Sequence, residues 1–192
     1  LPNGTADFVI QFWYKTQLLT FLPTDGVTPY SGALLTSNGA PGGLNIFFRS
    51  TDRISNIPTD VVVNCAGGTV AAWTAPILVD TWQFFTIQRS AGILTLWIDG
   101  NTVGSLAFPD SLSEGDQVNI GSYFQGGYES YWHGNMTAIN VEIGVAPYSG
   151  FFTPPLAPLN SDANTNLLLN VLNPGAALTD SSANGYNITS VA

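Results

Sequence analysis

Apolar and polar residues alternate along short segments of this chain, and glycine-rich turns separate the segments. In residues 7–15, DFVIQFWYK, the side chains of Phe8, Ile10, Phe12 and Tyr14 fall on one face of an extended strand. A helical period is almost absent. The same alternation predicts further strands at 32–37, 44–49, 60–65, 69–73, 84–89, 94–98, 102–108, 118–123 and 133–145.

The segment from Trp82 to Ser105, WQFFTIQRSAGILTLWIDGNTVGS, has the clearest pattern. It predicts strands joined by tight turns, the second at Asp99-Gly100-Asn101, so Asp99 is interpreted as a turn residue rather than a catalytic acid. Turns at this spacing favour a sandwich over a helical or α/β fold. The sequence therefore predicts an all-β fold, an antiparallel jelly-roll β-sandwich with one buried face per strand.

The 192 residues are predicted to form a single domain, 1–192, with its core at 7–147. Residues 148–160 contain prolines, which cannot donate ladder hydrogen bonds, so this segment should cross the surface in an extended form. Residues 166–191 are expected to contain closing strands, at 167–172 and 186–191. An unpaired apolar strand promotes aggregation, so the first of these is predicted to pair within the chain, beside strand 7–15.

Charge excludes several classes of partner. Charged residues make up 9% of the chain, the formal net charge is −9, and the basic residues are Lys15, Arg49, Arg53 and Arg89. Four scattered cations cannot form the basic stripe that nucleic acid or an anionic membrane requires, so neither is an expected partner.

No apolar run approaches the roughly 18 residues of a membrane span. The single cysteine, Cys65, is predicted to be a small buried residue.

Catalytic patterns are weak. A retaining glycosidase needs two carboxyl groups about 5–5.5 Å apart, but Glu114 and Asp116 fall in an expected turn and Glu142 stands alone in a strand. No Gly-x-Ser-x-Gly segment accompanies His133, the only histidine. The sequence therefore predicts a protein that is not an enzyme.

Position within strands also predicts burial. Trp73 and Trp82 are expected in the core, and Trp13 lies on the face opposite Phe12. Arg89 lies inside a strand, where a charge is expected on the solvent face or beside a carboxylate.

The order of these motifs resembles a known family. Residues 7–15, the Trp82–Ser105 segment, and VNIGSY followed by WHGNMTAINVEIGVA resemble the core strands of concanavalin A-like lectin and laminin G-like domains. The matches cover most of residues 7–147. GVAPYSGFFTPPLAPL (144–159) and LLLNVLNPGAALTDSSANGYNIT (167–189) resemble segments of such domains in phage and other viral structural proteins.

That resemblance implies a non-enzymatic structural or adhesion protein of a virion, such as a capsid decoration, spike or fibre. Expected partners are other virion subunits, with a homo-oligomer, and host glycans; the expected location is the virion surface or the extracellular space. The alternative is a carbohydrate-binding module of a secreted or cell-surface protein.

One segment, 123–133, combines aromatic rings with amides and a carboxylate, the groups that bind sugars. The candidate glycan-binding residues are Tyr123, Gln125, Tyr128, Glu129, Tyr131, Trp132 and His133. A capping loop or an oligomer contact is the other interpretation of this segment.

Calcium is the one cofactor left open, because related domains bind it through loop Asp and Asn residues. The loop aspartates are Asp25, Asp52, Asp60, Asp110 and Asp116, and none forms a recognised calcium motif.

Overall fold

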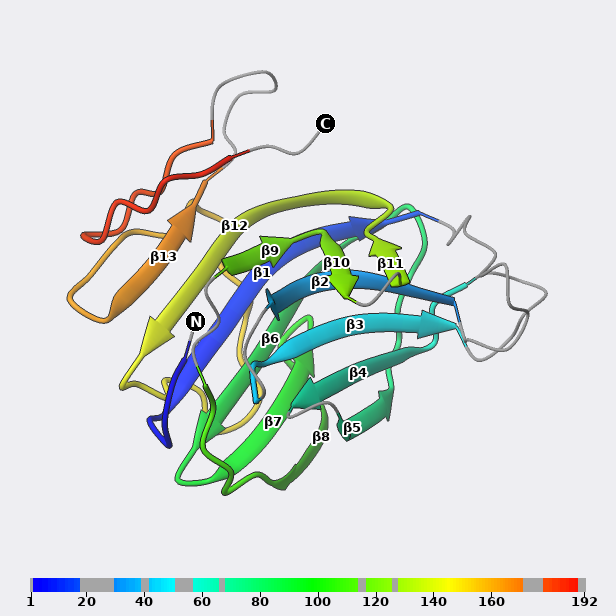
Figure 1. The fold of residues 1–192 in the computed structure, drawn as a ribbon, viewed down its shortest axis with the longest axis horizontal. Helices are drawn as coiled ribbons and strands as arrows, with labels where there is room; N and C mark the ends of the chain where they lie inside the picture. The colour runs from blue at the N-terminus through cyan, green and yellow to red at the C-terminus, as the bar shows by residue number, and fades with distance from the viewer. Residues whose placement is uncertain are drawn as a thin grey trace. The chain divides into compact units, whose positions relative to one another are not determined.

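The computed structural model describes residues 2–17, 30–38, 42–50, 57–65, 68–113, 117–125, 128–170 and 178–189. These residues form strands and turns and contain no helix, and hence no helix that could span a membrane (Figure 1). The strands are β1 (Phe8–Thr16), β2 (Tyr30–Asn38), β3 (Asn45–Ser50), β4 (Asp60–Cys65), β5 (Gly68–Thr74), β6 (Trp82–Ser90), β7 (Ile93–Ile98), β8 (Asn101–Ala107), β9 (Gln117–Ile120), β10 (Ser122–Gln125), β11 (Tyr128–Tyr131), β12 (Gly134–Ile143) and β13 (Thr165–Leu169).

The chain forms two compact units that are interleaved in sequence. The first unit contains Leu1–Thr5, Lys15–Thr81 and Pro109–Gly134, and the second contains Ala6–Tyr14, Trp82–Phe108 and Asn135–Ala192. Each unit is built around one antiparallel sheet. The expectation of a single domain at 1–192 stays a prediction.

The sheet of the first unit has the strand order β5-β4-β3-β2-β9, and β10 and β11 form a separate hairpin. Apolar side chains alternate across it, with Ile46 opposite Val63 and Phe48 opposite Val61. Cys65, at the end of β4, is buried as predicted, and its Sγ lies 3.2 Å from the carbonyl oxygen of Gly42.

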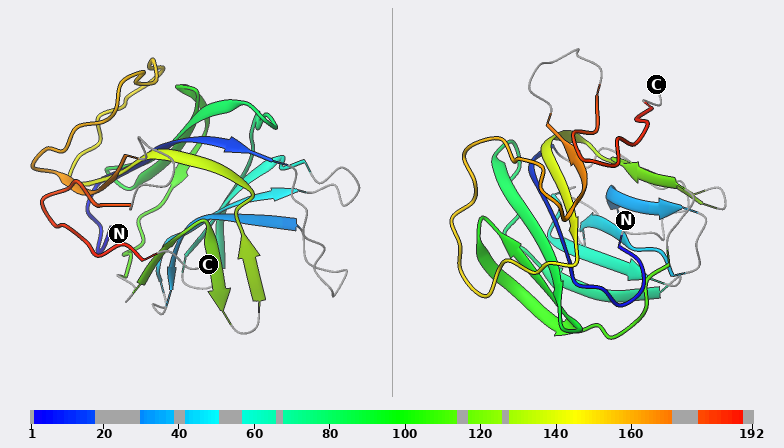
Figure 2. Two further views of the ribbon diagram at one scale, coloured as in Figure 1. Left: turned by 90° about the horizontal axis from the view of Figure 1, so that it is seen from above. Right: turned by 90° about the vertical axis from the view of Figure 1, so that its left-hand side faces the viewer.

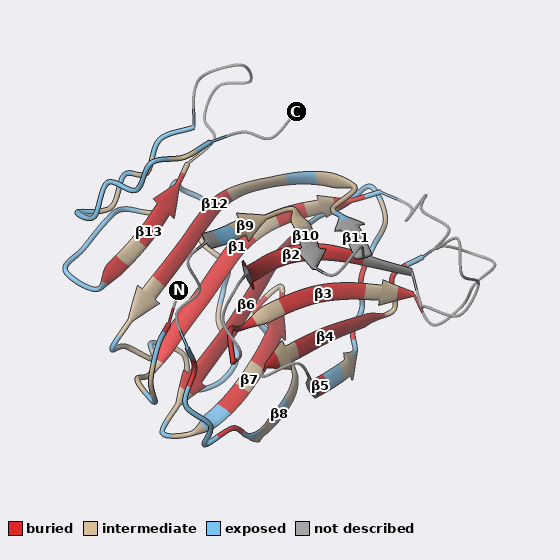
Figure 3. Cartoon of the chain, in the orientation of Figure 1, coloured by how far each residue is buried: buried red, intermediate tan, exposed pale blue. Residues whose placement is uncertain are grey.

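The sheet of the second unit has the order β13-β12-β1-β6-β7-β8. Strands β1 and β6 are buried along most of their length, whereas β8 at the sheet edge is largely exposed (Figure 3). On one face, the ring of Phe12 stacks on Phe85 with centroids 4.7 Å apart. On the same face, the hydroxyl of the buried Tyr14 donates to Gln83 Oε1 at 3.0 Å.

Two tight turns define the β6-β7-β8 meander and confirm the hairpins predicted from the sequence. Ala91 and Gly92 have φ values of 47° and 78°, and Asp99 and Gly100 have 53° and 75°. Two-residue loops with positive φ at both positions match the twist of antiparallel strands. The Asp99 carboxylate accepts hydrogen bonds from Phe84 N and Gln83 Nε2, as expected of a residue that fixes a turn.

The C-terminal strand pairs within its own chain, but its predicted neighbour is wrong. β13 pairs with β12, with Ile139 opposite Leu169 and Val141 opposite Leu167, because β12 already occupies the free edge of β1. In Figure 2 the orange β13 lies beside the yellow β12.

The predicted closing strand at 186–191 is absent over its described residues, 186–189. Asp180 accounts for the difference. Its carboxylate accepts hydrogen bonds from the backbone N–H groups of Leu168, Ser182 and Tyr186, so a side chain rather than a further strand satisfies the outer edge of β13.

Two further burial predictions are wrong. Trp82, expected in the core, is 46% exposed, because it is the first residue of β6 and lies at the rim of the sheet. The solvent-face alternative for Arg89 is wrong as well, because this side chain is only 1% exposed; its alternative position beside a carboxylate stays a prediction. Its Nε and Nη2 donate to the carbonyl oxygen of Ala6, and its guanidinium lies over the rings of Phe8 and Phe108, so a backbone acceptor and two aromatic faces accommodate the buried charge.

Candidate functional site

The aromatic segment predicted as a loop is a hairpin. β10 and β11 pair from Ser122–Tyr131 to Gln125–Tyr128, and Gly121, with φ of 76°, separates this hairpin from β9. The side chains of Tyr123, Gln125, Tyr128 and Glu129 lie outside the described part of the structure. Their assignment to glycan binding stays a prediction.

The other three candidates lie at the end of the hairpin. Tyr131 is 44% exposed, whereas the ring of Trp132 packs edge-on against Phe48 with centroids 5.4 Å apart. The carbonyl oxygen of His133 accepts a hydrogen bond from Gln17 N. Trp132 is therefore engaged in packing, and Tyr131 is the best placed of the three to meet a ligand.

No group of three His, Cys, Asp or Glu side chains in the described ranges could hold a metal ion. Asp60 pairs with Arg49 Nη2 at 2.8 Å and accepts from Thr74 Oγ1, and Asp110 is exposed. The other three loop aspartates considered for calcium, Asp25, Asp52 and Asp116, lie outside the described residues, as does Glu114.

The second unit carries a feature that the sequence did not single out as a site. Residues 145–155, here called the strap, follow β12 without strand structure; the extended surface crossing expected of 148–160 stays a prediction. The side-chain amide of Gln88 on β6 pairs with the strap backbone: Gln88 Nε2 donates to Tyr148 O at 2.8 Å, and Tyr148 N donates to Gln88 Oε1 at 3.0 Å. One amide thus holds the strap against the sheet as a strand neighbour would.

Aromatic rings complete the attachment of the strap. Tyr148 stacks on Phe152 with centroids 3.9 Å apart, and Phe152 contacts both Phe84 and Trp97. The indole N–H of Trp13 donates to Pro155 O at 3.1 Å. The face of the sheet that carries Trp13, Phe84, Gln88 and Trp97 is here called the strap face.

Tyr148 in the strap and Glu142 on β12 are both partly desolvated. The Tyr148 hydroxyl donates to Gln11 Oε1 at 2.7 Å. Burial, and then the nearby Glu142 carboxylate, raise the pKa of Tyr148. Burial also raises the pKa of Glu142, although the hydrogen bond from Asn140 Nδ2 opposes this shift. Both hydroxyl and carboxyl groups are therefore biased towards their neutral forms.

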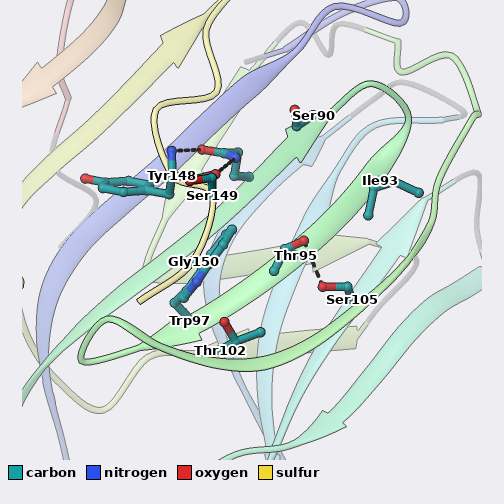
Figure 4. Close-up of a pocket in the computed structure, with 10 residues that line it drawn as sticks. Ser90, Ile93, Thr95, Trp97, Thr102, Ser105, Tyr148, Ser149 and Gly150 are labelled. Carbon is teal, nitrogen blue, oxygen red and sulfur yellow. Dashed lines mark hydrogen bonds between the residues drawn. The ribbon is translucent and has the colours of Figure 1, made fainter. Parts of the chain in front are cut away.

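Beside the strap, the strap face opens into a hollow of about 440 Å³ (Figure 4). Its floor is formed by alternate residues of β7, namely Ile93, Thr95 and Trp97. Its rim comes from β6, β8 and the strap, through Gln88, Ser90, Thr102, Ser105, Tyr148, Ser149 and Gly150. Every lining side chain is uncharged.

The hollow combines hydroxyl groups with apolar surface. Ser105 Oγ donates to Thr95 Oγ1 at 2.9 Å, drawn as a dashed line in Figure 4. Ile93 is 44% exposed beside this pair. The alternation ILTLWI at 93–98 signalled that Ile93, Thr95 and Trp97 share a face, but nothing in the sequence showed that the strap would leave this part of the face open.

Comparisons with known proteins agree on the fold. Neither a protein-family model nor a curated protein matches the sequence. Among solved structures, a Bacteroides ovatus protein provisionally assigned to carbohydrate binding is similar with a TM-score of 0.59 and 15% identity, covering 94% of this chain and 51% of that one. The chain thus spans about half the length of that protein.

Two further structures are similar over less of the chain. The heptameric SAP-like pentraxin of Limulus polyphemus has a TM-score of 0.51 and 14% identity, covering 73% of this chain and 65% of its own. The CBM40 of Ruminococcus gnavus IT-sialidase, solved with α2,3-sialyllactose, has a TM-score of 0.50 and 14% identity, covering 69% of this chain and 73% of its own.

None of these three structures is viral, so the virion role and the homo-oligomer stay predictions. At these identities the likeness concerns the fold alone. The prediction of the fold class is confirmed: the protein is an all-β, antiparallel sandwich of the concanavalin A-like and laminin G-like type.

Proposed function

We propose that this chain is a carbohydrate-binding domain that acts outside the cell or on a surface. The observation that carries the proposal is the uncharged hollow on the strap face, where hydroxyl groups border exposed apolar surface. Sugars present hydroxyls at their edges and C–H groups on their faces, so such a lining suits them. Similarity in fold to a Bacteroides ovatus protein provisionally assigned to carbohydrate binding supports the same class.

A binding role is favoured over hydrolysis because the hollow has no carboxyl group to act as an acid or nucleophile. Of the carboxylates in the second unit, Asp99 and Asp180 are engaged in backbone hydrogen bonds, and Glu142 accepts from Asn140. A protein that only binds sugars does not need the pair of catalytic carboxyl groups that a glycosidase uses.

Screening the purified chain on a glycan array, with 1–2 candidates confirmed by titration calorimetry, tests the proposal. We expect saturable binding to at least one glycan class, and, if the described residues carry the site, the same binding after treatment with EDTA, because no cluster of ligands for a metal lies among them. Absence of binding across the array, with the protein folded by circular dichroism, would rule the function out. Release of reducing ends from any bound glycan would contradict a purely binding role.

A further inference from the structure

We propose that the hollow selects neutral saccharides and binds them through Ile93, Thr95 and Trp97 on β7. The indole N–H of Trp97 donates a hydrogen bond to the sugar. This inference rests on the proposed function and narrows it to one ligand class and one surface. The aromatic β10–β11 hairpin is the competing surface, and the experiment below separates the two.

Charge in the second unit favours a neutral ligand. Its residues include five carboxylates, Asp7, Asp99, Glu142, Asp162 and Asp180, but only one cation, Arg89. That cation is buried and donates to the Ala6 carbonyl oxygen, away from the lining of the hollow. A sialic acid or uronic acid in the hollow would therefore meet no compensating charge within this unit and would be repelled by its net negative charge.

Spacing along β7 suits an elongated ligand. Ile93, Thr95 and Trp97 lie on one face at every second residue, so they span about 13 Å along the strand. In order they present an apolar side chain, a hydroxyl and an indole. This row can contact the C–H face of one sugar ring and the hydroxyls of the next.

The hydroxyl pair at the centre is poised for further hydrogen bonds. Thr95 Oγ1 accepts from Ser105 Oγ, which leaves the Thr95 proton available to donate and the Ser105 lone pairs available to accept. Hydroxyl chains of this kind strengthen each member by mutual polarisation. A sugar hydroxyl, itself a donor and an acceptor, complements both.

The indole N–H of Trp97 is an independent reason to place a ligand in the hollow. The side chain is 3% exposed and lines the hollow, yet its buried indole N–H has no hydrogen-bond acceptor in the part of the chain that the structure describes. A buried donor without an acceptor is unfavourable, so this N–H calls for a partner such as an ordered water or a ligand oxygen. A hydroxyl or ring oxygen of a sugar bound in the hollow would supply the missing acceptor.

Titration calorimetry on the whole chain tests this assignment. The neutral probes are cellohexaose, xylohexaose, mannohexaose and maltohexaose, and the acidic probes are hexagalacturonic acid and 3′-sialyllactose. The variants are Thr95→Val, Ser105→Ala and Trp97→Phe, each of which removes a polar group and keeps most of the shape. Thr5→Val, at an exposed threonine of the first unit, is the matched control, and Tyr131→Ala probes the hairpin.

We expect a neutral hexasaccharide to bind, with affinity about fivefold lower in Thr95→Val and Trp97→Phe, since one hydrogen bond is lost in each. The control should bind as the wild type does. If Trp97→Phe fails to fold, as judged by far-ultraviolet circular dichroism, Thr95→Val on the floor of the hollow and Ser105→Ala on its rim still decide the matter.

Preference for the acidic probes, or wild-type affinity in all three hollow variants, would overturn this inference. Loss of neutral-sugar binding in Tyr131→Ala alone would move the site to the hairpin and leave the carbohydrate-binding function standing. Failure of every probe here and on the glycan array would overturn both proposals.

Discussion

The two halves of the strap face differ sharply in how they are covered. Over β1 and the first half of β6, the strap seals the sheet: Trp13 and Phe84 pack together, and Phe152 packs on Phe84. Over β7 and β8, the strap stops short, and Ile93, Thr95 and Ser105 line an open hollow. One sheet face thus has a closed half made of aromatic rings and an open half made largely of hydroxyls.

That difference separates stability from recognition. Aromatic contacts and amide hydrogen bonds in the closed half position the strap, and the strap in turn forms one rim of the hollow. We therefore expect changes in the closed half to lower the free energy of unfolding, and changes in the open half to lower affinity with little loss of stability.

The largest expected effect follows from Gly100→Ala. Gly100 has φ of 75°, and a Cβ there would overlap the backbone carbonyl oxygen of Phe152 in the strap. Left-handed backbone strain together with this clash should lower the free energy of unfolding by about 3 kcal/mol or more. Urea denaturation measures the change.

Gly185→Ala provides the matched control, because Gly185 has φ of 57° but open space around the position of a Cβ. Strain alone should cost about 1 kcal/mol there. Equal losses in the two variants would show that the contact between Gly100 and the strap contributes nothing.

A smaller loss is expected from Gln88→Leu. This change removes both hydrogen bonds between the Gln88 amide and the Tyr148 backbone while roughly keeping volume, and it leaves a backbone N–H and C=O without these partners. We expect a loss of about 2 kcal/mol. Gln17→Leu, at an exposed glutamine, should stay within about 0.5 kcal/mol of the wild type; a similar loss there would argue against the role of the amide pair.

The sequence predicted most of the strands because their signals are local. Alternation over 84–89 and the Asp99-Gly100 turn specify the β6-β7-β8 meander without reference to the rest of the chain. It missed β11, since YESY at 128–131 mixes aromatic and polar residues without a period of two. It also misplaced β13, whose neighbour depends on which strand already occupies the edge of β1.

The hollow could not be predicted, because it depends on contacts between distant positions. Gln88 and Tyr148 are 60 residues apart, and nothing in the sequence around either residue predicts their contact. Serine and threonine are common on exposed strands, so Thr95 and Ser105 carry no individual signal. The aromatic cluster at 123–133 stood out in the sequence because of its density, although Trp132 there is occupied with packing against Phe48.

Tyr148→Phe should produce a loss of about 1 kcal/mol, measured by thermal or urea unfolding, because it removes the hydrogen bond to Gln11 Oε1 and keeps the ring stack on Phe152. Tyr186→Phe is its control. The Tyr186 hydroxyl is exposed and lies 3.5 Å from Asn166 Oδ1, too far for a strong bond, so the same change should be nearly neutral. Equal effects would mean that the Tyr148 hydroxyl does not help to hold the strap.

The smallest effect concerns pH and Glu142, at the margin of the closed half. Burial raises the pKa of this carboxyl above its unfolded value, so the folded state holds the proton more tightly than the unfolded state does. The stabilisation that this preference brings is fully present below the unfolded pKa and is lost as the pH rises through the folded pKa. Above that pH, the partly buried ionised carboxylate lowers the free energy of unfolding.

Glu142→Gln isolates this contribution, since the glutamine keeps an oxygen to accept from Asn140 Nδ2 and cannot ionise. Relative to the wild type, the variant should be more stable at pH 7 than at pH 4, with the change falling between the unfolded pKa of Glu142 and its raised folded pKa. Urea unfolding at both pH values measures the difference, and Glu142 is only partly buried, so the effect should be the smallest of the four. A difference that stays constant with pH, or one that favours the wild type at pH 7, would mean that the fold leaves this carboxyl as well solvated as it is in the unfolded chain.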